Sequence, residues 1–162
     1  MALDFNADDA LEMAEQIERR GGKFYRKAAK DTSHPQTREV LLDLAHKEDE
    51  HLAIFVAMRK RLSEGASDPT AFDPYGEAPL YLQAMADAHV FGAASSEDLL
   101  TGGETPAQIL KLAMGFEKDT IAFFVGIKVA VPERLGKPQI DRLIREEMNH
   151  VVILNQALSA LG

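Results

Sequence analysis

No cysteine occurs in the chain. Disulfide bonds, zinc ribbons, iron–sulfur clusters and thiol catalysis are therefore excluded. Long apolar runs are missing too, because no uninterrupted stretch approaches the roughly 20 residues that a membrane-spanning helix needs. The first residues, Met-Ala-Leu-Asp-Phe-Asn, lack the basic and then apolar pattern of a signal peptide. These absences predict a soluble, cytoplasmic protein that does not enter a membrane.

An excess of positive charge is also absent. The 18 lysines and arginines stand against 26 aspartates and glutamates, which gives a net charge of -8. Because nucleic-acid phosphates require a basic face, we expect no nucleic-acid partner. A chain of 162 residues is long enough to bury the core of one domain, and we expect residues 1–162 to form a single domain.

Proline and glycine fall largely between four segments with helical periodicity, in which apolar residues recur every three or four positions. These segments are residues 7–30, 35–63, 105–131 and 138–161. Asn6 suits the N-cap of the first segment. At the start of the third, Thr105 and Gln108 predict a capping box, with Pro106 at the first helical position.

The 40-residue stretch 65–104 is too long to be a simple connection. Part of it, about residues 78–91, is compatible with a shorter helix. Two short hairpins joined by one long crossover are the ferritin-like arrangement of four-helix bundles. The sequence therefore predicts an all-α, antiparallel, ferritin-like four-helix bundle with a short helix in the crossover. A crossover of this length would also allow two chains to exchange helix pairs.

The two halves of the chain repeat at low identity. A shift of 99 residues aligns apolar positions of the first and second halves, such as Leu11 with Leu110 and Leu44 with Leu143. The same shift brings six polar residues into register: Glu18 with Glu117, Glu48 with Glu147, and His51 with His150.

All six polar residues interrupt apolar faces of the predicted helices, so we expect them to point inward. Glu18 and Glu48 are 30 residues apart, as are Glu117 and Glu147, and each pair is centred on a predicted turn. In a helical hairpin, equal distance from the turn means equal height, so the four glutamates should meet at one level. Buried carboxylates cost several kcal/mol each unless they are paired or bind metal.

A Glu-x-x-His pair places an oxygen and a nitrogen ligand on one face of a helix. Two glutamates and two Glu-x-x-His pairs on four helices are the ligand set of di-iron and di-manganese carboxylate bundles. We therefore predict a two-metal site that holds two iron ions, with manganese as the alternative. Its ligands are Glu18, Glu48, His51, Glu117, Glu147 and His150. The competing interpretation is a metal-free bundle in which these side chains pair with one another.

Tyr25 lies two helical turns after Glu18, whereas the repeat places Phe124 at the corresponding position. A tyrosine there can hydrogen-bond a ligand or relay an electron, and it can equally be an ordinary core residue. Phenylalanine can neither hydrogen-bond a ligand nor relay an electron.

These motifs resemble the rubrerythrin-type branch of the ferritin-like superfamily. The residues that carry the resemblance are Glu18 with Phe24-Tyr25, Glu48-Asp-Glu-His51, Glu117 with Phe123-Phe124, and Glu147-Met-Asn-His150. The resemblance implies a non-haem di-iron centre that reacts with peroxide or dioxygen. It further implies that Glu48 and Glu147 bridge the metals, and that the chain forms a homodimer.

The chain departs from the rubrerythrin pattern in two ways. It lacks the four cysteines of a rubredoxin-like domain, so turnover requires an external electron donor. Thr120 stands where rubrerythrins typically carry a further metal-binding glutamate, which leaves a set closer to a ferroxidase centre. We expect an iron-oxidising oxidoreductase of the peroxidase or ferroxidase type. The alternatives are a non-catalytic iron carrier or metal-responsive module, and a structural bundle without metal.

Overall fold

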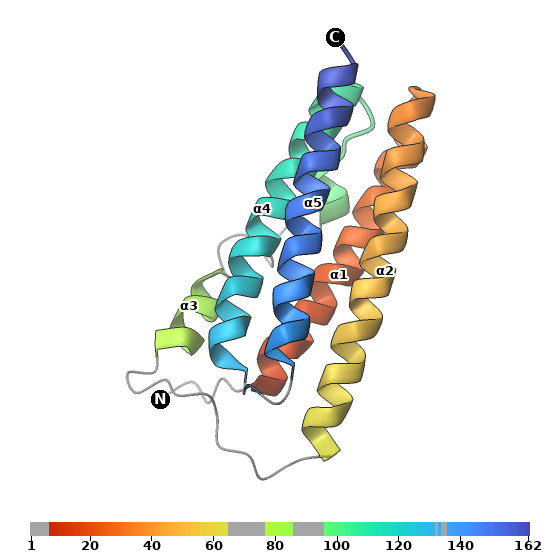
Figure 1. Ribbon diagram of the computed structural model, residues 1–162. Helices are drawn as coiled ribbons and strands as arrows, with labels where there is room; N and C mark the ends of the chain where they lie inside the picture. Colours follow the sequence, from red (N-terminus) through yellow and green to blue (C-terminus); the bar gives the residue numbers. More distant parts are fainter. Residues whose placement is uncertain (1–6, 65–76, 86–95, 132, 134–135) are drawn as a thin grey trace.

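The computed structural model describes residues 7–64, 77–85, 96–131, 133 and 136–162, and no strand occurs in these parts of the chain. Four long helices form a bundle: α1 (Ala7–Asp31), α2 (Pro35–Glu64), α4 (Pro106–Ala130) and α5 (Lys137–Ala160). A short helix, α3 (Glu77–Met85), and a 3-10 turn, η2 (Ser96–Leu99), lie between α2 and α4 in the sequence (Figure 1). The predicted all-α class is confirmed.

The long helices form two antiparallel hairpins, α1–α2 and α4–α5, whose turns lie at opposite ends of the bundle (Figure 1). The two hairpins pack through α1 against α4 and through α2 against α5. Because α2 and α4 run in the same direction, the chain must return along the length of the bundle between them. This is the predicted topology of two hairpins joined by a long crossover.

Local sequence explains where the helices begin. The Thr105 hydroxyl accepts a hydrogen bond from the Gln108 amide (3.2 Å), and the Gln108 side chain accepts one from the Thr105 amide (2.8 Å). The predicted capping box at the start of α4 is therefore confirmed. At the other hairpin, Arg38 on α2 donates to the carbonyl oxygens of Ala29 (3.0 Å) and Thr32 (2.8 Å) at the end of α1. The proposed N-cap Asn6 lies outside the described residues.

The crossover helix α3 packs against α4. Tyr81 donates a hydrogen bond from its hydroxyl to the carbonyl oxygen of Ala122 (3.0 Å). A Cβ at Gly126 would lie 2.6 Å from the Tyr81 ring, so the close approach requires glycine there. We predicted a helix at 78–91, and the described helix ends at Met85. Residues 86–91 of that prediction lie outside the described residues.

The bundle interior consists of two apolar clusters with a polar layer between them. One cluster lies towards the N-terminal end of α1 and includes Leu11, Phe55 and Leu143. The other lies towards the α1–α2 turn and includes Phe24 and Leu110. Among the described helices, none is long and apolar enough to cross a bilayer. The apolar clusters fix the heights of the helices and thereby the level of the polar layer.

Candidate metal centre

The polar layer between the two clusters consists of the six residues predicted as ligands. Each long helix contributes through its inward face, and no member of the set is more than 2% exposed. The structure thus brings together all six, with α1 and α4 each supplying one glutamate and α2 and α5 each supplying a Glu-x-x-His pair: Glu18, Glu48, His51, Glu117, Glu147 and His150.

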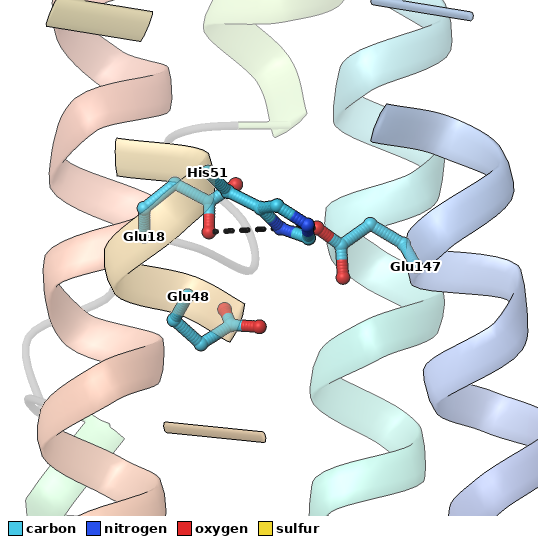
Figure 2. A group of neighbouring side chains, drawn as sticks. All are labelled: Glu18, Glu48, His51 and Glu147. Atoms are coloured by element: carbon cyan, nitrogen blue, oxygen red, sulfur yellow. Dashed lines mark ion pairs between the residues drawn. The ribbon is translucent and has the colours of Figure 1, made fainter. Parts of the chain in front are cut away.

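The six side chains divide into two overlapping groups of four. Within each group, one potential ligand atom per residue lies within 4.8 Å of the others. The Glu18–His51 subsite comprises Glu18, Glu48, His51 and Glu147, which point toward one another from α1, α2 and α5 (Figure 2). The Glu117–His150 subsite comprises Glu48, Glu117, Glu147 and His150. Glu48 and Glu147 belong to both groups, so they are placed as shared carboxylates.

The imidazoles face these carboxylates through their Nδ1 atoms. In the Glu18–His51 subsite, Nδ1 of His51 lies 2.7 Å from Glu147 Oε1 and 3.7 Å from Glu18 Oε2. In the other subsite, Nδ1 of His150 lies 2.8 Å from Glu147 Oε2 and 3.3 Å from Glu117 Oε1. The two rings stack with centroids 5.4 Å apart and planes inclined by 11°. Both ligand nitrogens are thus directed at the same small volume.

These close approaches lack hydrogen-bond geometry. Buried side-chain atoms without a hydrogen-bond partner are found in all six residues: both carboxylate oxygens of Glu18, Glu48 and Glu147, Oε2 of Glu117, and Nδ1 of His51 and His150. Buried polar atoms are normally satisfied, because an unpaired one costs about 1–3 kcal/mol. A cluster of unpaired oxygen and nitrogen donors therefore fits a site for cations, and the donor types fit iron or manganese.

The charge state of the metal-free cluster supports the same interpretation. Burial and the neighbouring carboxylates raise the pKa of Glu18, Glu48 and Glu117 well above the ordinary value. Burial acts in the same direction on Glu147, but the two nearby imidazoles lower its pKa to about 2. Burial opposes protonation of His150, yet the surrounding carboxylates raise its pKa to about 12. Protons thus balance the charge in the absence of metal, and bound cations would take their place.

Tyr25 contacts a candidate ligand directly. Its fully buried hydroxyl donates a hydrogen bond to Oε1 of Glu117 on α4. Burial, together with the charge of Glu117, raises the tyrosine pKa well above 10.0, so the phenol keeps its proton and remains a donor. Of the interpretations left open by the sequence, the contact favours a tyrosine that supports a ligand.

Glu146 was not predicted as part of the site. Its Oε2 lies 2.9 Å from Nε2 of His51, on the ring edge that faces away from the cluster. Its other oxygen, Oε1, accepts a hydrogen bond from Nε of Arg142 at 2.7 Å. Partial burial raises the pKa of Glu146, but these bonds lower it overall. Carboxylates that bind the outer nitrogen of a metal-binding histidine orient the ring.

Gly21 is a second residue that the sequence analysis did not assign. A Cβ at this position would collide with Oε2 of Glu48 and would lie 3.2 Å from the Phe116 ring. The missing side chain therefore leaves the space that the shared carboxylate occupies. In the sequence, only its spacing of three residues after Glu18, on the same face, could have drawn attention to it.

Thr120 occupies the position where we noted a departure from the rubrerythrin pattern. The residue is buried, and its hydroxyl donates to the carbonyl oxygen of Phe116 at 3.0 Å within α4. The side chain is thus satisfied by its own helix. It offers no carboxylate to the cluster.

Comparison with known proteins places the fold. Residues 9–87, just under half of the chain, match the family model described as Rubrerythrin. A solved structure from Thermotoga maritima, described as a candidate ferritin-like diiron-carboxylate protein, superposes with a TM-score of 0.73 over 97% of both chains at 23% identity. None of the curated proteins matches the chain. The structural likeness covers both hairpins, whereas the family match covers the first hairpin and part of the crossover.

Proposed function

We propose that the chain is a rubrerythrin-like member of the ferritin-like superfamily, and that it is a non-haem di-iron oxidoreductase that oxidises iron with peroxide or dioxygen. The observation that carries the proposal is the cluster of unpaired, buried oxygen and nitrogen atoms in two groups that share Glu48 and Glu147. A structural bundle without metal would leave these atoms unsatisfied in its interior, at a cost that folding would have to offset.

The donor set fits two divalent cations. Four carboxylates neutralise four positive charges, and two neutral imidazoles add ligands without changing that balance. Glu18 and His51 would hold one ion, Glu117 and His150 the other, and the shared carboxylates would hold both. Oxygen-rich sites with imidazole suit iron and manganese, and the rubrerythrin match favours iron.

A pair of ferrous ions bound here would supply two electrons on becoming ferric, enough, with two protons, to reduce one hydrogen peroxide molecule to two water molecules. The residues of the chain keep the site dry and fixed. Apolar clusters on both sides exclude bulk water, and the Tyr25 hydroxyl holds Oε1 of Glu117, the oxygen that lies 3.3 Å from Nδ1 of His150. Relay of an electron through the Tyr25 phenol stays a prediction.

Thr120 and the absence of cysteine bear on the reaction. Without a further carboxylate at position 120, the six-ligand set is closer to a ferroxidase centre than to a rubrerythrin peroxidase. Electrons must come from an external donor, since the chain has no cysteine-bound iron to store them. The alternative function is an iron carrier or a metal-responsive module with the same site.

Metal analysis combined with rapid kinetics tests the proposal. We expect about two iron ions per chain after anaerobic loading and desalting. Mixing the ferrous protein with peroxide, and separately with dioxygen, should produce ferric absorbance faster than the same concentration of free ferrous iron does. Two bound ions with no acceleration by either oxidant would support the carrier, and no bound metal would overturn the proposal.

A further inference from the structure

The two histidines differ at the nitrogen that faces away from the cluster. Nε2 of His51 is hydrogen-bonded to Glu146, which Arg142 holds from its other side. The 99-residue repeat places Lys47 at the position corresponding to Glu146. A lysine ammonium cannot accept a hydrogen bond, and this one pairs with Glu50 at 2.7 Å on the surface. The part of the chain that the structure describes holds no carboxylate partner for Nε2 of His150.

This difference changes how well each imidazole binds a cation. Acceptance of the Nε2 proton by a carboxylate fixes the tautomer in which Nδ1 carries a free lone pair, and it makes that nitrogen a stronger donor. Nδ1 of His51 is the atom that faces Glu18 and Glu147. The ring is therefore oriented for binding before metal arrives.

Among the glutamates, it is the member of the other subsite, Glu117, that has a hydrogen-bond partner outside the cluster. Oε1 of Glu117 accepts a hydrogen bond from Tyr25, which withdraws electron density from that carboxylate. Both oxygens of Glu18 lack a hydrogen-bond partner, so the whole carboxylate remains available. The Glu18–His51 subsite thus combines an uncommitted carboxylate with a strengthened imidazole.

We propose that Glu146 is a positioning residue that makes the Glu18–His51 subsite the first of the two to take up metal. The inference rests on the proposed two-metal function. It adds an order of loading and names the residue that sets this order. Arg142, whose side chain is 72% exposed, contributes by holding the Glu146 carboxylate against His51.

Calorimetric titration of the metal-free protein with Co²⁺, which does not react with dioxygen, tests the order. We expect two binding steps, with the first about 10- to 100-fold tighter than the second, as second-layer partners of metal-binding histidines typically confer. Anomalous scattering from crystals grown with one equivalent of Co²⁺ should locate that ion between Glu18 and His51.

Four variants separate positioning from a merely structural role. Glu146→Ala should weaken the first step about 10- to 100-fold, whereas Glu146→Gln, which still accepts from Nε2, should restore part of the loss. Lys47→Ala is the matched control at the repeat position and should leave both steps unchanged. Lys47→Glu should tighten the second step, because it places a carboxylate where the repeat would put a partner for His150.

Each outcome bears on one claim. Two equal steps in the unaltered protein, or a first step that Glu146→Ala leaves unchanged, would overturn the order of loading and leave the two-metal function standing. Absence of bound Co²⁺ and Fe²⁺ would overturn the function itself. Should Glu146→Ala fail to fold, as judged by helical circular dichroism, the Lys47→Glu titration still decides: an unchanged second step contradicts the proposal.

Discussion

In the α1–α2 hairpin, Glu48 and His51 follow Glu18 by 30 and 33 residues, and in the α4–α5 hairpin the same intervals separate Glu147 and His150 from Glu117. The hairpins thus present the same ligand types at the same height. Their surroundings differ at the positions that support those ligands. The corresponding pairs are Tyr25 and Phe124, Gly21 and Thr120, and Lys47 and Glu146.

The differences alternate between the subsites. Tyr25 on α1 supports Glu117 of the second hairpin, while Glu146 on α5 supports His51 of the first. Each hairpin therefore holds a ligand of the other, and each subsite has one ligand with an outer hydrogen-bond partner. The repeat thus preserves the candidate ligands, whereas the residues behind them differ between the two subsites.

The largest effect is expected from the carboxylates that the hairpins share. Glu48→Gln or Glu147→Gln removes a charged ligand from both groups, so each variant should lose both ions. Glu18→Gln or Glu117→Gln affects one group and should lose one ion. Metal content per chain after anaerobic loading measures the difference, with Glu39→Gln, an exposed position on α2, as the control. Two ions retained in both shared-carboxylate variants would refute the site.

A smaller but still large effect is expected where Gly21 and Thr120 differ. Gly21→Ala places a methyl group against Oε2 of Glu48 and the Phe116 ring, so it should destabilise the protein by about 1–3 kcal/mol and impair metal loading. Gly115→Ala, an exposed helical position where a Cβ meets no atom within 4 Å, should instead stabilise by about 0.5–1 kcal/mol. Denaturant unfolding measures both, and a neutral Gly21→Ala would contradict the contact.

The Tyr25 and Phe124 pair supplies the next prediction. Tyr25→Phe makes the first hairpin match the second and leaves Oε1 of Glu117 buried without its donor. The expected loss is about 1–3 kcal/mol of unfolding free energy in the metal-free protein. Tyr81→Phe removes the hydroxyl of a tyrosine that is 43% exposed and should cost less. Equal losses of unfolding free energy in the two variants would contradict the stabilising role of the hydrogen bond from Tyr25 to Glu117.

The smallest effect concerns the way the helices of the second hairpin begin. The Thr105 side chain caps α4, whereas Gly136, with φ of 122°, begins α5 without a side-chain cap. Thr105→Ala should lower stability by about 1 kcal/mol, whereas Thr105→Ser should retain the cap and the stability. Thermal unfolding of the two variants provides the measurement, with no change in metal content expected. A loss of metal would mean that the cap also positions the site.

Much of the fold was predictable because the helices follow strong local rules. The apolar period of three to four residues and the capping box gave the four long helices to within two residues of their ends. The shorter α3 was predicted over residues 78–91, and its described part agrees with that prediction as far as Met85. The weak amphipathic pattern of this segment does not indicate where the helix ends. The packing of α3 against α4 depends on Tyr81 and Gly126, which are distant in sequence.

The six candidate ligands were predictable because their spacing is periodic and repeated. Their convergence in space agrees with that prediction. The supporting residues were harder to predict. Glu146 sits next to Glu147 in the sequence but on a different face, and only the angle between α2 and α5 decides that it reaches His51. Likewise, the hydrogen bond from Tyr25 crosses from α1 to α4, a distance that periodicity on one helix cannot reveal.

The apolar clusters on both sides of the polar layer restrict the route by which ions and oxidants can reach the centre. A hydrated ion cannot travel along a bundle axis that is packed with side chains such as Phe24 and Phe55, so exchange with solvent must occur sideways, between helices. Glu146, whose side chain is 29% exposed and contacts the fully buried His51, connects the centre to solvent between α2 and α5. We therefore expect ions and oxidants to enter between α2 and α5.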